Sequence, residues 1–164
     1  MKGPDKFLIG IVAGVLVLVV VVLGVLLTRP QIEYVAADTA EGVAHNYLLA
    51  LQREDYERAY SYLSPEIKGY PDSVTQFKRD LEFSGRWFYD GASVTLEILS
   101  FDELSSDRAV VEVRETRYFS GGLLSSSQYD HDFDIYLSLV DGSWVITDGD
   151  QYFAYCWNDT SGCK

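Results

Sequence analysis

The sequence predicts an α+β protein in which an N-terminal transmembrane helix is followed by helices packed on an antiparallel β-sheet. Three observations lead to this fold class. A long apolar run lies near the N-terminus, helical periodicity extends over residues 39–83, and apolar and polar residues alternate over most of residues 93–155. Helices first and strands afterwards is the element order of an α+β domain.

The apolar run extends from Phe7 to Thr28 and contains no charged residue. At about 1.5 Å of rise per residue, a helix of this length crosses a hydrocarbon core about 30 Å thick. Lys2 and Lys6 precede the run, whereas only Arg29 follows it before the first acidic residues, and positive charge favours the cytoplasmic side. We therefore expect a single-pass protein of the cell membrane: a cytoplasmic tail (1–6), a transmembrane helix (7–28), a linker (29–38) and one extracytoplasmic domain (39–164).

A cleaved signal peptide is the alternative interpretation of this run. The stretch Val35-Ala36-Ala37 resembles a cleavage site, but Arg29 and Pro30 separate it from the apolar residues. The apolar core of a signal peptide is about 7–15 residues long, shorter than this run. Length and flanking residues favour an uncleaved signal-anchor.

The chain is strongly acidic. It has 13 Lys and Arg against 25 Asp and Glu, for a net charge of −12. Such a surface repels nucleic acid and anionic lipid headgroups, so we exclude nucleic acid as a partner. The chain also has 12 Tyr, 8 Phe and 3 Trp, which can serve a core, a pocket or a contact surface equally well.

The two cysteines, Cys156 and Cys163, lie close together near the C-terminus. They could form a disulfide, remain free thiols or supply half of a metal site. No His lies near them and their spacing does not match a zinc site. Because the domain is expected outside the cytoplasm, we predict a disulfide that contributes about 2–3 kcal/mol.

Three helices are expected before the sheet. Residues 39–52 carry apolar side chains at a spacing of 3.6 residues, with Thr39 as the N-cap. A second helix begins near Asp55 and ends at Ser64-Pro65, and a third extends from Ser73 to about Phe83.

Four strands are expected after the helices. They span residues 93–102, 108–119, 129–140 and 143 to about 155, where apolar and polar residues alternate. A turn at Ser105-Ser106-Asp107 joins the first two strands, and Asp141-Gly142 forms a tight hairpin turn between the last two.

Three motifs resemble the nuclear-transport-factor-2-like (cystatin-like) superfamily, in its bacterial membrane-anchored, extracytoplasmic form. They are Ala-x-x-Tyr47-Leu-x-Ala-Leu51, Asp55-Tyr-Glu-x-Ala59-Tyr60-x-Tyr-Leu63-Ser-Pro65 and Asp141-Gly-Ser-Trp144-Val-Ile146-x-Asp148. The resemblance spans residues 39–155. It implies a strongly curved sheet wrapped around a long helix, which together form a cone with a pocket at its open end. The superfamily contains isomerases, dehydratases and cyclases, and also members that only bind, dimerise or serve as accessory domains, so the fold does not choose between these functions.

Acid/base chemistry in such a cone needs a carboxylate or histidine in an apolar cavity, together with a donor that stabilises an oxyanion. Strand alternation places Glu115 and Arg117 on the inner face of the second strand, His131 on that of the third and Asp148 on that of the fourth. The catalytic candidates are therefore His131, Asp148 and Glu115, and the candidates for lining a pocket are Trp87, Tyr118, Tyr129 and Arg117. The alternative is that these groups are solvated at strand ends, with Glu115 and Arg117 paired to each other.

Neither a metal nor a cofactor is expected. Asp130, Asp132 and Asp134 begin like a calcium loop, but Ile135 and Asp141 occupy the positions where an EF-hand needs Gly and Glu. We expect the three aspartates to form a solvated row along one outward strand face.

These observations favour a membrane-anchored extracytoplasmic binding or interaction module that is not an enzyme. The partner would be a small hydrophobic ligand, an envelope protein or a second copy of the chain. The alternative is a cone-type acid/base enzyme, of isomerase, dehydratase or cyclase type, acting on a small hydrophobic molecule with His131 or Asp148 as the base.

Overall fold

The computed structural model describes residues 6–27, 32–84, 93–120 and 126–163. Contacts divide the chain into two units, Met1–Glu33 and Tyr34–Lys164. The first unit contains α1 (Lys6–Leu27), whose bounds agree within one residue with the predicted apolar helix.

Side chains of α1 are described for Phe7 and for residues 9–24. Within the described parts of the chain, no helix combines the length and the apolar character needed to cross a membrane. The membrane anchor, and the division of the N-terminal region into tail, anchor and linker, stay predictions.

The second unit begins with α2 (Ala40–Gln52), the helix on which the core is built. Thr39 caps it as predicted, because its Oγ1 accepts a hydrogen bond from Gly42 N at 3.0 Å. Asn46 is buried and exchanges two hydrogen bonds of 2.8 Å with the backbone N–H and C=O of Val35. The amide group of Asn46 therefore satisfies both backbone groups of Val35, which lies outside the helices and strands.

Two shorter helices follow. α3 (Tyr56–Ser61) is capped by Asp55, and α4 (Val74–Ser84) begins after Ser73. α3 ends earlier than the periodicity predicts, because the next residues leave the helix to pair with the sheet. Ile146 N donates to Tyr62 O at 2.8 Å, and Ser64 N donates to Ile146 O at 2.8 Å.

The sheet is a four-stranded antiparallel meander in the order β1-β2-β3-β4. Its strands are β1 (Ser93–Ser105), β2 (Arg108–Ser120), β3 (Ser126–Val140) and β4 (Ser143–Gly149). The tight turn predicted at Asp141-Gly142 is confirmed: both residues have positive φ, 50° and 81°, as a two-residue hairpin of the right twist requires.

The prediction that the fourth strand continues to Tyr155 is wrong. β4 ends at Gly149, and the chain then turns through Tyr152, whose φ of 57° lies in the left-handed region and is incompatible with a strand. A short 3-10 helix, η1 (Tyr155–Asn158), follows. Backbone conformation, which side-chain alternation does not report, ends the strand.

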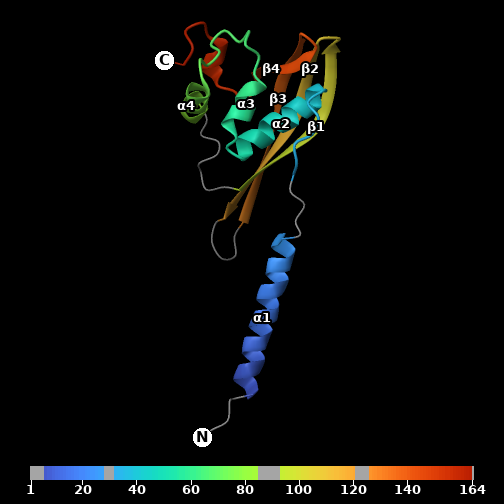
Figure 1. Ribbon diagram of the computed structural model, residues 1–164, viewed down its shortest axis with the longest axis vertical. Coiled ribbons are helices and arrows are strands. Elements are labelled where there is room, and N and C mark those ends of the chain that lie inside the picture. Colours follow the sequence, from blue (N-terminus) through green and yellow to red (C-terminus); the bar gives the residue numbers. More distant parts are fainter. Residues whose placement is uncertain (1–5, 28–31, 85–92, 121–125, 164) are drawn as a thin grey trace. The chain divides into compact units, whose positions relative to one another are not determined.

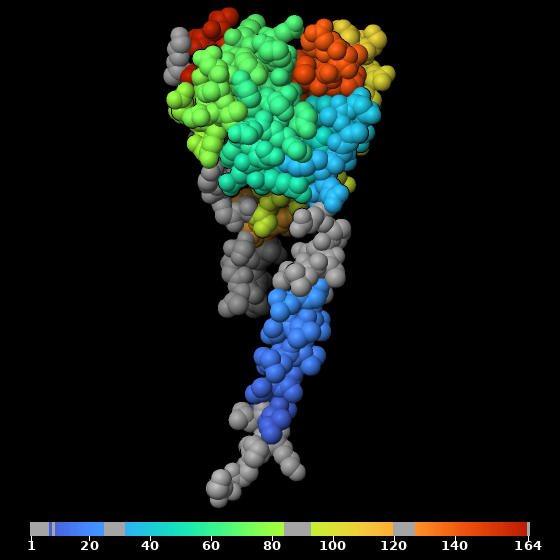
Figure 2. All heavy atoms as spheres, viewed as in Figure 1, coloured from blue at the N-terminus to red at the C-terminus, as the bar shows by residue number. Residues whose placement is uncertain are grey.

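The core lies between α2 and one face of the sheet, called the inner face below. Figure 1 shows the long strands bending together across α2, and Figure 2 shows that α2, α3 and α4 cover this side of the domain. The fully buried side chains come from both layers: Val43, Ala44, Tyr47 and Leu51 from α2, and Ala109, Val111, Val113, Ile135, Leu137 and Ile146 from the sheet. The α+β class and the curved antiparallel sheet are as the sequence predicts.

The C-terminal segment closes the other end of the core. Cys156 and Cys163 form the predicted disulfide. Trp157 is fully buried, stacks on Phe77 with ring centroids 5.4 Å apart, and donates from Nε1 to Asp80 at 3.0 Å. The disulfide loop therefore holds a tryptophan that packs against α4.

Candidate functional site

A carboxylate is buried at the end of an otherwise apolar row of side chains on β2. Ala109, Val111 and Val113 point to the inner face, and the strand alternation brings Glu115 to the same face, where only 1% of the residue is exposed. The prediction that Glu115 faces inward is confirmed. A buried carboxylate is costly unless charged or hydrogen-bonding groups surround it.

Among the described residues, Arg117 and Tyr152 interact with Glu115. Arg117, two residues further along the same face, donates from Nε to Glu115 Oε1 in an ion pair. The phenol of Tyr152 lies close enough for the charge of the Glu115 carboxylate to raise its pKa. Burial raises the pKa of Tyr152 most, and Glu115 raises it further, while Arg117 lowers it.

Tyr152 is a site residue that the sequence analysis missed. It lies beyond the end of β4 in a left-handed backbone conformation, so no strand alternation assigns it a face. The Tyr47 hydroxyl donates to the Tyr152 carbonyl, and the ring of Phe133 packs 5.5 Å from the Tyr152 ring, centroid to centroid. These contacts from α2 and β3 hold the backbone and the ring of Tyr152 in place.

A hollow of about 380 Å³ opens beside this group. Its lining residues are Glu115, Arg117, Phe119, Tyr129, His131 and Gln151. In the β2–β3 register, Glu115 lies opposite His131, and Arg117 lies opposite Tyr129, so these four side chains share one face. The Tyr129 and His131 rings are nearly parallel, at 15°, with centroids 6.5 Å apart. Both are exposed at the mouth of the hollow.

Two of the predicted candidates, Asp148 and Tyr118, are not in this group. A β-bulge shifts the β3–β4 register so that Asp148 lies opposite Tyr136 rather than on the face of Ile146; its carboxylate accepts from Asn158 Nδ2 at 2.9 Å. The predicted inward orientation of Asp148 is therefore wrong. Tyr118 alternates to the face opposite Arg117 and is 43% exposed. Trp87 lies outside the described residues.

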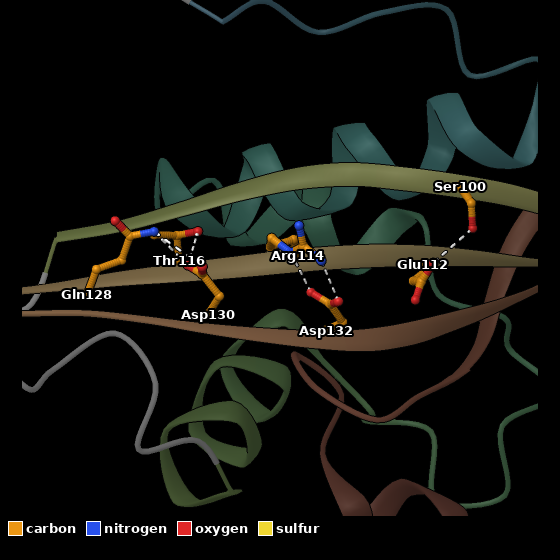
Figure 3. A network of polar contacts seen from close by, with 7 residues as sticks. All are labelled: Ser100, Glu112, Arg114, Thr116, Gln128, Asp130 and Asp132. Carbon is orange, nitrogen blue, oxygen red and sulfur yellow. Dashed lines mark hydrogen bonds and ion pairs between the residues drawn. The ribbon is translucent and has the colours of Figure 1, made fainter.

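The outer face of the same strands carries a different set of polar contacts, shown in Figure 3 with α2 behind the sheet. Arg114 binds Asp132 through two hydrogen bonds of 2.7 Å. Thr116 donates to Asp130 at 2.8 Å. Hydrogen bonds from Arg114 hold the pKa of Asp132 below its usual value, and hydrogen bonds from Gln128 and then Thr116 do the same for Asp130. Asp130 and Asp132 are exposed on the outer face, as predicted, whereas Asp134 is half-buried and burial raises the pKa of its carboxyl.

The hollow combines groups with complementary chemistry. An imidazole such as that of His131 can act as a general base or acid, and a guanidinium such as that of Arg117 can stabilise negative charge on oxygen. Among the described residues, no group of three or more His, Cys, Asp or Glu side chains could hold a metal ion. The arrangement suits proton transfer on an organic molecule.

No protein-family model matches the chain, and no curated protein matches it. Some solved structures are similar to it in fold. A SEC-C motif containing protein from Rhodopseudomonas palustris is 18% identical, with 77% of this chain and 86% of that chain covered and a TM-score of 0.49. A ketosteroid isomerase-like protein from Erwinia carotovora atroseptica is 16% identical, with 69% and 92% covered and a TM-score of 0.47. A scytalone dehydratase-like protein from Novosphingobium aromaticivorans is 17% identical, with 66% and 77% covered and a TM-score of 0.44.

These comparisons correct one prediction, that the domain is not an enzyme. Structures named for an isomerase and for a dehydratase are among those that the chain is similar to. A further similar structure, from Shewanella oneidensis, is named an NTF-2 like protein; it is 15% identical, with 65% and 90% covered and a TM-score of 0.43. The non-enzymatic interpretation is therefore not retained.

Proposed function

We propose that the domain is an acid/base enzyme that moves a proton on a small, largely apolar molecule bound in the hollow of β2 and β3. The observation that carries the proposal is the buried Glu115 carboxylate with Arg117 and Tyr152 on one side and His131 opposite it in the register. Exposure orders these groups: His131 is exposed, the Arg117 side chain is 21% exposed, and the Glu115 side chain is 2% exposed. An incoming molecule therefore meets His131 and Arg117 before Glu115.

The exposure order assigns the roles. His131 removes a proton from a carbon next to a carbonyl group, and the electron pair of the broken C–H bond moves to the carbonyl oxygen. Arg117 stabilises the enolate oxygen that forms, while Glu115 holds the Arg117 guanidinium in place. The protonated His131 then returns the proton, either to another carbon, which isomerises the molecule, or to a hydroxyl group, which leaves as water.

Proton abstraction can be tested without knowing the substrate. The full-length chain, in a non-ionic detergent, would be incubated with 3-cyclohexenone, and formation of the conjugated ketone would be followed by ultraviolet absorbance. Deuterium uptake from D₂O by a panel of cyclic and aryl ketones, followed by mass spectrometry, covers substrates of other shapes. We expect the protein to accelerate at least one of these reactions above the rate in buffer.

Matched histidine variants test whether His131 transfers the proton. Because general acid/base groups contribute about 10²–10⁴-fold to a rate, we expect His131→Gln to lower it by about 100-fold or more. His45→Gln serves as the control, since His45 lies on α2 and does not line this hollow. A panel-wide absence of exchange, or a His131→Gln rate equal to that of the wild type, would contradict the proposal.

We also propose that residues 7–28 anchor the domain to a membrane, with the N-terminus in the cytoplasm and the domain outside. The support is the sequence itself: the run has no charged residue, and Lys2 and Lys6 precede it. We expect the chain to stay in the membrane pellet after washing with alkaline carbonate and to be digested by protease added to intact cells. Release into the carbonate supernatant would contradict the anchor.

A further inference from the structure

A second hollow lies where α4 packs beside the C-terminal segment (Figure 1). Its volume is about 390 Å³, and its lining residues are Arg79, Asp80, Phe83 and Cys163. We propose that it binds a free α-amino acid with an apolar side chain, whose ammonium group contacts Asp80 and whose carboxylate contacts Arg79. None of these residues lines the hollow of β2 and β3. The inference therefore goes beyond the proposed function and does not depend on it.

Asp80 supplies a buried carboxylate to this hollow. Only 1% of the residue is exposed, and its Oδ2 accepts a hydrogen bond of 3.0 Å from Trp157 Nε1. Within the described parts of the chain, its Oδ1 accepts no hydrogen bond and no Lys or Arg forms an ion pair with it. A buried carboxylate is costly without a cation, because water no longer solvates the charge. A neutral indole covers one of the two oxygens, so the other can receive a cation that enters the hollow.

Arg79 supplies the opposite charge at the mouth of the hollow. The residue is exposed, and its side chain forms neither a hydrogen bond nor an ion pair with another described residue. Although Arg79 and Asp80 are adjacent in the chain and line the same hollow, they are not paired with each other. A guanidinium presents its N–H groups in a planar fork that matches a carboxylate. Two opposite charges that share a hollow without pairing suit a ligand that carries both.

Phe83 and the disulfide supply the apolar part of the wall. Arg79 and Phe83 are four residues apart and are therefore neighbours on one side of α4. Phe83 is 74% exposed, so a ligand side chain that packs on its ring removes apolar surface from water. The sulfur of Cys163 is bonded to Cys156 and carries no charge. The volume lies near the lower end of small-molecule sites, about 300–1,000 Å³, which suits a ligand of the size of an amino acid.

The contacts of Trp157 hold the Asp80 carboxylate in place. The indole is fully buried, stacks on Phe77 and meets the ring of Phe153 edge-on, with centroids 4.9 Å apart. The Trp157 carbonyl accepts a hydrogen bond of 2.8 Å from Gly69 N. The indole therefore has a fixed position, and its N–H fixes that of the carboxylate. A site that is ordered before the ligand arrives binds it at a lower entropic cost.

Three molecules with the same ring and chain length separate the two charges. L-phenylalanine carries both, 2-phenylethylamine carries only the ammonium group, and 3-phenylpropanoate carries only the carboxylate. Their binding to the full-length chain in non-ionic detergent would be measured by isothermal titration calorimetry at neutral pH. We expect L-phenylalanine to bind at least about 10-fold more tightly than either analogue, because each analogue lacks one charge-assisted contact. An affinity for L-phenylalanine no higher than that for either analogue would overturn the inference.

A polar amino acid tests the apolar wall. L-serine carries the same two charges as L-phenylalanine but cannot cover the Phe83 ring, so we expect it to bind several-fold more weakly. L-serine bound as tightly as L-phenylalanine would overturn the assignment of an apolar side chain to the ligand.

Charge variants of α4 locate the binding. Asp80→Asn keeps an oxygen for the hydrogen bond from Trp157 but removes the charge, and we expect it to weaken the binding of both ammonium compounds by about 10-fold or more. We expect Arg79→Gln to reduce the affinity for L-phenylalanine to that for 2-phenylethylamine, and to leave the binding of 2-phenylethylamine unchanged. Equal effects of Arg79→Gln on the two compounds would overturn the role of Arg79.

Glu82→Gln and Lys78→Gln are the matched controls. Glu82 and Lys78 pair with each other on the same helix, and neither is among the described residues that line the hollow. These variants change the net charge by the same amounts as the site variants, and we expect L-phenylalanine binding to stay unchanged in both. Circular dichroism establishes folding; should Asp80→Asn fail to fold, the exposed Arg79 decides. Equal losses in site and control variants would overturn the inference.

The inference and the proposed function can fail separately. L-phenylalanine binding that depends on Asp80 and Arg79, without proton exchange on any ketone, would leave the inference standing and remove the proposed reaction. Proton exchange that depends on His131, without saturable binding of L-phenylalanine, would do the reverse.

Discussion

The two faces of β2 carry the same kind of ion pair in different surroundings. On the inner face Arg117 pairs with Glu115, and their side chains are 21% and 2% exposed. On the outer face Arg114 pairs with Asp132, and theirs are 42% and 37% exposed (Figure 3). The residue types are alike and the arginines are three positions apart on one strand. The pairs differ in burial and in geometry: the inner pair joins two residues of β2, whereas the outer pair joins β2 to β3 through two hydrogen bonds.

This difference in burial gives the two ion pairs different effects on stability. A buried ion pair adds little net stability, but removing one partner leaves a desolvated charge and is costly. An exposed ion pair adds little to the free energy of unfolding, and removing it lowers that free energy only slightly. Loss of either member of the inner pair is therefore expected to be costly, whereas loss of the outer pair, which is exposed, is not.

The largest expected effect is on the inner carboxylate. Glu115→Gln leaves Arg117 without its charged partner and is expected to lower the free energy of unfolding by about 2–3 kcal/mol. Glu112→Gln, on the outer face, removes only the acceptor of a hydrogen bond from Ser100 and should cost less than about 1 kcal/mol. Urea unfolding followed by tryptophan fluorescence measures both. Equal losses would show that burial does not separate the two faces.

Alkaline pH is expected to destabilise the fold through its buried tyrosine side chains. Burial raises the pKa of Tyr47 and of Tyr152 above the ordinary tyrosine value. The unfolded chain then releases these protons above pH about 10 while the native chain keeps them, so stability is present below pH 10 and falls as the pH rises. For two such phenols, the free energy of unfolding is expected to fall by about 2 kcal/mol between pH 10 and pH 11.

The control for this pH dependence is Tyr118→Phe, because Tyr118 is exposed on the outer face. Urea unfolding at pH 9, 10 and 11 should show the same decline in this variant as in the wild type, and a smaller decline in Tyr47→Phe. An unchanged slope in Tyr47→Phe would exclude that buried phenol as a cause.

A smaller loss of stability is expected when a tyrosine hydroxyl is removed from either face of the sheet. Tyr152→Phe removes a buried hydroxyl near the Glu115 carboxylate and should cost about 1–2 kcal/mol. Tyr136→Phe removes the hydroxyl that donates to Asp134 at 3.4 Å on the outer face and should cost about 0.5 kcal/mol or less. Thermal unfolding measures the stability of both variants. A larger loss in Tyr136→Phe than in Tyr152→Phe would contradict the expected difference between the two faces.

The smallest effect is expected for the outer pair itself. Arg114→Gln should change the free energy of unfolding by less than about 1 kcal/mol, because an exposed pair is solvated in both states. Raising the salt concentration should remove most of that difference. A loss comparable to that of Glu115→Gln would mean that the outer face is a structural support.

Much of the fold could be predicted because its signals are local. Thr39 caps a helix through its own side chain, and Asp141-Gly142 turns a hairpin through positive φ at both residues. Strand alternation correctly placed Glu115 on the inner face and Asp132 on the outer face. Each of these features depends on neighbours within a few residues, so the sequence expresses it directly.

The site was harder to predict because it depends on contacts between residues that are far apart in the chain. Asp148 was assigned to the wrong face since one bulge in β4, set by pairing with β3, reverses the alternation. Tyr152 was missed since its place depends on Tyr47, 105 residues away in the chain. No periodicity expresses a contact of that separation.

The sequence by itself determined the element order, the meander with its turns, the disulfide partners and the facing of Glu115, Arg117 and His131, because these follow from local backbone preference and a period of two. Only the tertiary structure decided that Glu115 is buried rather than solvated, that Tyr152 completes its surroundings and that Asp148 lies elsewhere. Burial is a property of packed layers: the same carboxylate and guanidinium are a surface pair or a buried pair according to what packs over the strand.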